Sequence, residues 1–174
     1  MPQFRLTEKY AKDCRINNLS APQSALHLLD DWFIDVIRVN RKKVAMATHA
    51  QSAFTFLIPY AEIGGAVAIP EGIGILLKEL LYENDLSAWA EQVDRLFYEP
   101  AIFCKTVNRS ILGHMNDFSR LVKGYADHYA SLHSPISWDK MTKKINRTPI
   151  NFATTEQSLY PVEILGKLIG HSLS

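Results

Sequence analysis

A run of β-branched and aromatic residues between Trp32 and Pro59 constrains the fold more than any other feature of the sequence. It divides into three strand-length segments separated by short polar joints. Phe54, Phe56 and Ile58 recur at period two, which places them on one face of a strand that should meet helices. Joints this short allow hairpins, so the run predicts an antiparallel meander. Its segments are residues 33–39, 44–48 and 54–58.

Further strands and helices are predicted on both sides of the meander. An apolar–polar–apolar alternation at residues 4–6 predicts an N-terminal strand, followed by a helix over residues 8–14 with Thr7 as its N-cap. Residues 101–106 predict a later strand. Together these segments indicate an α+β fold, in which a small antiparallel sheet packs against several helices. The remaining predicted helices are a short one capped by Ser24 and running through Leu29, one over residues 71–83, one capped by Ser87, one over residues 111–129, one over residues 138–145 capped by Ser137, and one from Pro161 to near Gly170.

Length and composition favour one globular domain over residues 1–174. Hydrophobic residues make up 47% of the 174 residues and charged residues 21%, which is close to the average for globular proteins. The most apolar stretch, residues 63–81, is interrupted by Pro70, Glu71 and Lys78, so no membrane span is expected. Because the first residues lack an apolar leader, we expect a cytoplasmic protein.

No metal, cofactor or disulfide is predicted. Cys14 and Cys104 form no C-x-x-C pair and are expected to be reduced, largely buried thiols. His114 and Asp117 are three residues apart and could face one metal ion, but no further ligand cluster accompanies them. His49 is expected to be a hairpin residue. The P-loop, the G-x-G-x-x-G fingerprint and the G-x-S-x-G elbow are all absent from the sequence.

The densest polar cluster, residues 108–117, lies where the later strand leads into the long helix. Arg109 and His114 have the R-x4-6-H spacing of HEPN ribonucleases, in which arginine steadies a phosphate and histidine moves the proton of the attacking 2′-hydroxyl. Asn116 or Asp117 would then orient the reacting groups. The N-terminus of a helix also favours anions, which makes this cluster a candidate phosphate site.

A purely structural interpretation of the same cluster is also open. Asn108 or Ser110 would cap the long helix. Asp117 would lie on the surface, and Arg109 would pair with a neighbouring carboxylate.

Two clusters of basic residues offer local positive charge in a chain whose net charge is only +1. Each could neutralise several phosphates and so support salt-dependent binding of nucleic acid or of a protein partner. Alternatively, they are a solvated turn and a solvated helix face. The first cluster comprises Arg38, Arg41, Lys42 and Lys43 around the first hairpin, and the second comprises Lys140, Lys143, Lys144 and Arg147 around a short helix.

Several segments together resemble an uncharacterised family of bacterial proteins, a domain-of-unknown-function family that is frequent on plasmids and other mobile DNA. The sharpest similarity is the string RSILG…MND within residues 108–117, where this chain departs by carrying His114 after Gly113. The resemblance implies a shared fold and a shared polar site, with no established reaction. The other similar segments are residues 4–9, 31–33, 40–43, 54–59, 105–113, 146–150 and 162–165.

Two functions of different classes follow. The first is an accessory or interaction protein of a mobile-element or defence locus, antitoxin-like, that binds nucleic acid or a protein partner through the basic hairpin and Arg109. Its expected binding residues also include Asn108, Ser110 and Asn116, beside Arg38, Arg41, Lys42 and Lys43 of the hairpin. The second is a metal-independent ribonuclease with Arg109, His114 and Asp117 as its catalytic residues.

Overall fold

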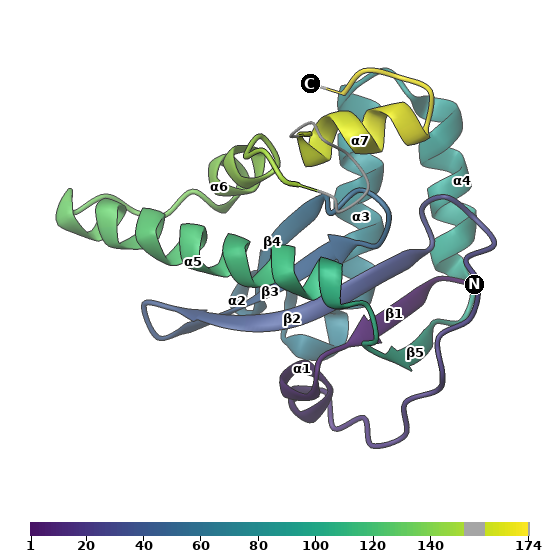
Figure 1. The fold of residues 1–174 in the computed structure, drawn as a ribbon, viewed down its shortest axis with the longest axis horizontal. Helices are drawn as coiled ribbons and strands as arrows, with labels where there is room; N and C mark the ends of the chain where they lie inside the picture. Colours follow the sequence, from purple (N-terminus) through teal and green to yellow (C-terminus); the bar gives the residue numbers. More distant parts are fainter. Residues whose placement is uncertain (152–158, 174) are drawn as a thin grey trace.

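A computed structural model of the chain describes residues 1–151 and 159–173. Five strands form one sheet in the order β4-β3-β2-β1-β5 (Figure 1), and helices cover it. The α+β class predicted from the sequence is therefore confirmed. The strands are β1 (Gln3–Leu6), β2 (Asp31–Val39), β3 (Lys42–His49), β4 (Thr55–Pro59) and β5 (Ile102–Lys105). The helices are α1 (Glu8–Asp13), α2 (Tyr60–Ile63), the 3-10 turn η1 (Ala66–Ala68), α3 (Ile69–Glu83), α4 (Ser87–Tyr98), α5 (Arg109–Ser131), α6 (Trp138–Ile145) and α7 (Pro161–Leu168).

The central meander is confirmed, because β2, β3 and β4 pair antiparallel in sequence order. The first hairpin turns at Asn40 and Arg41, whose φ angles are 47° and 67°. Positive φ at both central residues is the type I′ geometry that matches the twist of a two-residue hairpin. As a result Arg38 on β2 lies directly opposite Lys43 on β3.

The sheet as a whole is mixed, because β1 pairs parallel with both β2 and β5. A parallel neighbour needs a connection that returns the chain to the same end of the sheet. Residues 7–30, including α1, provide that connection between β1 and β2, and α3 and α4 lie on the path between β4 and β5. The predicted strands are therefore correct, while the antiparallel pairing holds only within the meander.

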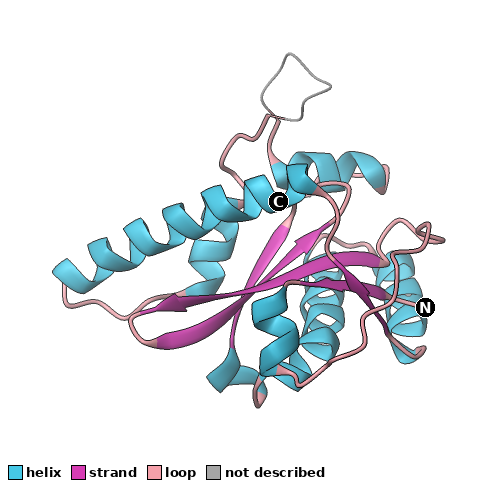
Figure 2. Cartoon of the chain, turned by 60° about the horizontal axis from the view of Figure 1, so that its bottom comes forward, coloured by secondary structure: helices cyan, strands magenta, loops and turns pink. Residues whose placement is uncertain are grey.

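Helices lie on both faces of the sheet (Figure 2), because the central strands are apolar on both sides. Trp32 and Ile34 point into one core, to which α3, α4 and α7 also contribute. Phe33 and Ile37 point into the other core, against α5 and α6. Phe54, Phe56 and Ile58 meet the α3 side, as their spacing predicts.

The short helix predicted after Ser24 does not form; residues 21–30 are turns and irregular chain. Asp30 gives the physical reason. One of its carboxylate oxygens, Oδ2, accepts hydrogen bonds from the backbone N–H groups of Leu26 and His27, each at 3.0 Å. An aspartate that binds nearby backbone N–H groups favours a turn over a helix. The caps predicted at Thr7, Asn108 and Ser137 do form. The cap predicted at Ser87 is wrong, because Ser87 is the first residue of α4 and Leu86 takes the N-cap position without a side-chain hydrogen bond.

His49 ends β3, as predicted, but it is fully buried rather than at an exposed turn. Its Nδ1 lies 2.9 Å from the Ser52 hydroxyl and its Nε2 lies 2.8 Å from the Leu28 carbonyl. Burial lowers the pKa of His49 to about 4. Cys14 and Cys104 are free thiols, and burial raises the pKa of each. In the described residues, no helix is long and apolar enough to cross a membrane.

Candidate functional site

A groove of about 800 Å³ runs between α1, the β2–β3 hairpin and the middle of α5. In Figure 1 this is the side of the sheet on which the long green helix α5 passes over β2, with α1 beneath. We refer to it as the basic groove, because six of the residues that line it are lysine or arginine and two are aspartate. Its charged and polar lining residues are Lys9, Lys12, Asp13, Asp35, Arg38, Lys43, Asn116, Ser119, Arg120 and Lys123.

Helix α1 supplies two of the cations, Lys9 and Lys12. Thr7 caps the helix, its hydroxyl accepting a bond from the Tyr10 N–H at 3.4 Å. Tyr10 and Ala11 are the buried residues of the helix. Because Lys9 and Lys12 stand three positions apart, they lie on one side of the helix. Both are exposed to solvent.

The hairpin supplies Arg38 and Lys43 from its paired strands. The Lys43 ammonium lies 2.6 Å from a carboxylate oxygen of Asp13 on α1. The other oxygen of Asp13 accepts the Tyr60 hydroxyl at 3.1 Å, and burial, with Asp13 nearby, raises the pKa of Tyr60. Lys43 is therefore anchored, and it ties α1 to the hairpin, whereas Arg38 is exposed.

Helix α5 supplies Asn116, Arg120 and Lys123. At about 100° per residue, these positions and Arg109 fall within roughly 60° of one another around the helix axis. Arg109 therefore continues the same stripe about 10 Å beyond Asn116 toward the helix N-terminus. Arg120 lies 3.2 Å from Asp117, and both side chains are mostly exposed.

The groove is an electrostatic site with few internal partners for its cations. Among the described residues, no ion pair engages Lys9, Lys12, Arg38 or Lys123, whereas Lys43 and Arg120 each pair with an aspartate. Asp35 accepts a hydrogen bond from the Thr7 hydroxyl at 2.6 Å. Among the residues that the structure describes, no aromatic side chain lines the groove. The arrangement can therefore hold an anion by charge, but it offers no ring on which a nucleobase could stack.

The cluster predicted at residues 108–117 is only partly brought into this groove, through Asn116. Asn108 caps α5, because its side-chain oxygen accepts the N–H groups of Ser110 at 3.0 Å and Ile111 at 3.3 Å. Ser110 and Arg109 are exposed at the first turn. The structural interpretation of Asn108 is thus confirmed, and Asp117 lies on the surface with Arg120 as its partner instead of Arg109.

Arg109 and His114 do not face one another across a cleft, since both belong to α5. A separation of five residues turns their side chains about 140° apart around the helix axis. His114 is half-buried, and burial lowers its pKa against the opposing effect of Asp117. The ribonuclease hypothesis stays a prediction from the sequence. In the described part of the chain no group of three metal-ligating side chains comes together.

The two predicted basic clusters have different surroundings. Of the first, Arg38 and Lys43 line the groove, while Arg41 and Lys42 are exposed at the hairpin turn. In the second, Lys143 lies 3.3 Å from Asp139, and the Lys144 ammonium lies 3.8 Å from the ring centre of Tyr125. Among the described residues, Lys140, Lys144 and Arg147 form no ion pair, so this second cluster keeps three such cations against four in the groove.

Sequence reasoning missed Lys9, Lys12 and Arg120 as parts of one site. The pattern that could have indicated them is the spacing of basic residues on a single helix side, three apart on α1 and at positions 109, 120 and 123 on α5. Nothing local in the sequence, however, shows that α1 and α5 lie on either side of one hairpin, because that proximity depends on the sheet order.

The fold and the groove define an α+β protein with a mixed five-stranded sheet and a basic surface groove. The chain belongs to the DUF6933 family, described as a domain of unknown function, which matches residues 3–164. Comparison with curated proteins and with solved structures found no match.

Proposed function

We propose that this protein binds the phosphate backbone of nucleic acid through the basic groove. The observation that carries the proposal is the convergence of six lysines and arginines from three separate elements on one groove, four of them without an ion pair in the described chain. Lysine and arginine bind nucleic acid largely by displacing the counterions of its phosphates. Exposed, unpaired cations are suited to that exchange, since they have no internal partner to give up.

The lining of the groove favours the backbone over the bases. Sequence-specific recognition of single strands relies on aromatic rings that stack on bases, and none of the described residues that line the groove is aromatic. The ligand is therefore a nucleic acid bound without strong base preference. An acidic protein would meet the same cations, and it is the competing occupant that the experiment must distinguish.

We further propose a biological role as a cytoplasmic accessory protein of a mobile-element or defence locus, acting in the manner of an antitoxin. The resemblance carried by residues 108–117 supports this role, together with a groove suited to a charged partner. A toxin gene next to the coding gene would agree with the role. A lone gene that is toxic on expression would contradict it and favour the ribonuclease hypothesis.

Binding of labelled 20-base-pair RNA and DNA duplexes at 50 and 200 mM salt tests the proposed function. With about four phosphates neutralised, affinity should fall about 100-fold between these salt concentrations. The triple variant Lys12→Ala, Arg38→Ala, Lys123→Ala removes three of the four unpaired groove cations. It should bind at least tenfold more weakly at 50 mM salt, and its dependence on salt should be much flatter.

A matched control separates the groove from net charge. Lys140, Lys167 and Arg95 are exposed and lie outside the groove, and replacing all three by alanine removes the same charge. This control should bind duplex within about twofold of the unmodified chain. Equal losses in the two triple variants would reject the groove. If neither the RNA duplex nor the DNA duplex binds, but an acidic polypeptide such as polyglutamate does, the partner is a protein instead.

A further inference from the structure

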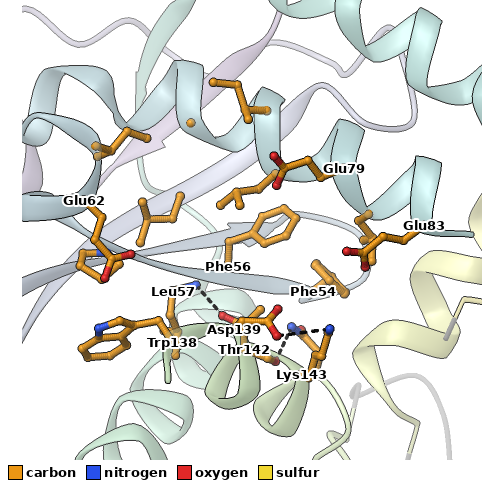
Figure 3. Close-up of a pocket in the computed structure, with 18 of the residues that line it drawn as sticks. Phe54, Phe56, Leu57, Glu62, Glu79, Glu83, Trp138, Asp139, Thr142 and Lys143 are labelled. Carbon is orange, nitrogen blue, oxygen red and sulfur yellow. Dashed lines mark hydrogen bonds and ion pairs between the residues drawn. The ribbon is translucent and has the colours of Figure 1, made fainter. Parts of the chain in front are cut away.

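A second hollow, of about 430 Å³, lies on the other side of the meander, between α3 and α6 (Figure 3). Its floor is apolar and partly aromatic. Phe54 directly precedes β4 and Phe56 lies within it, and both side chains extend into the space between the two helices. Trp138 lies at the α6 wall. Ile75, Leu76 and Leu80 of α3 form the opposite wall. The volume lies in the range of roughly 300–1,000 Å³ that is typical of small-molecule sites.

The free edge of β4 is already covered beside this hollow. The side-chain amide of Asn146 makes two hydrogen bonds to the backbone of Thr55. Its oxygen accepts the Thr55 N–H, and its NH₂ group donates to the Thr55 carbonyl, each at 2.7 Å. The Thr142 hydroxyl accepts the Leu57 N–H at 3.2 Å, a bond that is dashed in Figure 3. An extended peptide that joins a sheet needs such backbone groups. Side-chain contacts remain for an occupant, which favours a small molecule over a peptide strand.

The charges around the hollow are mainly negative. Glu62, Glu79 and Glu83 are exposed on the α2–α3 side, and within the described residues none of them forms an ion pair. Across the hollow, α6 and the residues after it contribute Lys143, which pairs with Asp139, and Arg147. Glu79 and Glu83 stand four residues apart on α3, where like charges repel. A cation bound near both would relieve that repulsion.

We infer that the hollow between α3 and α6 binds a small organic cation, an amine or guanidine carried on an aromatic or alkyl body. The body packs on Phe54, Phe56 and the apolar side of α3. The cationic group lies at the rim, next to Glu79 and Glu83. Attraction between the cationic group and the Phe rings of the floor adds to this preference. The site is independent of the basic groove, because the two share no lining residue.

Three probes with one apolar body test the inference: 4-phenylbutylamine, 4-phenylbutanol and 4-phenylbutyrate. Binding is followed by calorimetry and by the fluorescence of Trp138, using Trp138→Phe to assign the signal. The amine should bind at least tenfold more tightly than the carboxylate, with the alcohol between them. The double variant Glu79→Gln, Glu83→Gln should bind the amine about fivefold to tenfold more weakly, since exposed ion pairs are individually modest, while the alcohol is unaffected.

Controls make every outcome decisive. Glu91→Gln with Glu163→Gln removes two exposed carboxylates outside the hollow and should leave amine binding within twofold. Leu80→Trp should fill the hollow and weaken all three probes, and its thermal unfolding reports whether it folds. Equal affinity of the three probes, or no binding of the amine at 5 mM, would overturn the inference. Tighter binding of an eight-residue Lys- and Phe-containing peptide than of the amine would assign the hollow to a peptide instead.

Discussion

The basic groove and the hollow between α3 and α6 flank the same sheet but recognise ligands in different ways. The groove gathers long cationic side chains, most of them exposed, and none of the described residues in its lining carries a ring. The hollow has an aromatic floor and carries its charges at the rim. Charge alone attracts and steers, whereas a shaped apolar surface fixes the body of a ligand. The comparison teaches that a chain of net charge +1 can offer two sites of opposite sign, because only local placement matters.

The two sites also differ in what holds their walls together. The walls of the groove are joined by the half-buried ion pair of Asp13 with Lys43 and by the hydrogen bond from the Thr7 hydroxyl to Asp35. The α6 wall of the hollow depends on Asn146, which is buried and hydrogen-bonds both groups of Thr55 and the Thr142 carbonyl. Buried hydrogen bonds of a side-chain amide are costly to lose, because the backbone groups that they satisfy cannot bind water instead. Damage to the fold should therefore affect the hollow before the groove.

The largest effect is expected for Asn146→Ala. It removes the partner of two backbone groups on β4, each costing about 2 kcal/mol when left unsatisfied, so the free energy of unfolding should fall by about 4 kcal/mol. Urea unfolding followed by circular dichroism measures this loss. At low urea concentration, amine binding at the hollow should be weakened while duplex binding at the groove persists. Simultaneous loss of both activities in folded protein would break the comparison.

Acid should weaken both sites together, through His49. Burial lowers its pKa to about 4 in the folded chain, against about 6.5 in the unfolded chain. The unfolded chain therefore binds the proton more readily, so the stability is complete above about pH 6.5 and falls as the pH drops toward 4. The loss is at most about 3 kcal/mol, and the lowered pKa of His114 acts in the same direction.

Urea unfolding at pH 7, 5.5 and 4.5 measures the loss, and His49→Gln provides the comparison. The variant should be less stable at pH 7, but its stability should change much less over this range. If the variant shows the same dependence on pH as the unmodified chain, another group is responsible.

Salt should weaken binding at the groove much more than binding at the hollow. Raising it from 50 to 200 mM is expected to weaken duplex binding at the groove about 100-fold, with several phosphates neutralised. A probe with a single charge should lose less than about fourfold at the hollow, because most of its affinity comes from apolar contact. Titrations of both ligands under identical buffers compare the two slopes. Similar slopes would mean that the amine binds through charge alone.

The sequence predicted the elements better than it predicted their convergence. The meander followed from residue types between Trp32 and Pro59, and the caps at Thr7 and Asn108 from single side chains. These are local features, whose causes lie within a few residues. The parallel pairing of β1 depends on where the chain returns after α1 and after α4, and no local pattern contains that information.

The same distinction explains the candidate site. Arg38 and Lys43 were predicted together because one hairpin holds them, but Lys12 joins them only through the placement of α1 beside β2. The failed helix after Ser24 shows the opposite limit. There a side chain at Asp30 binds the local backbone and overrides a pattern of apolar residues that fits a helix.

The smallest effect tests whether α5 takes part in the groove. Asp117 and Arg120 are 67% and 81% exposed, and their contact is 3.2 Å, so Asp117→Asn should change the free energy of unfolding by less than about 0.5 kcal/mol. The substitution frees Arg120, and duplex binding at 50 mM salt should tighten about twofold to threefold.

Asp139→Asn, which frees Lys143 on α6, is the matched control and should leave duplex binding unchanged. Weaker binding by Asp117→Asn would place the phosphates away from α5, and loss of an RNA-cleaving activity in that variant would favour the ribonuclease hypothesis, because that hypothesis alone gives Asp117 a catalytic role.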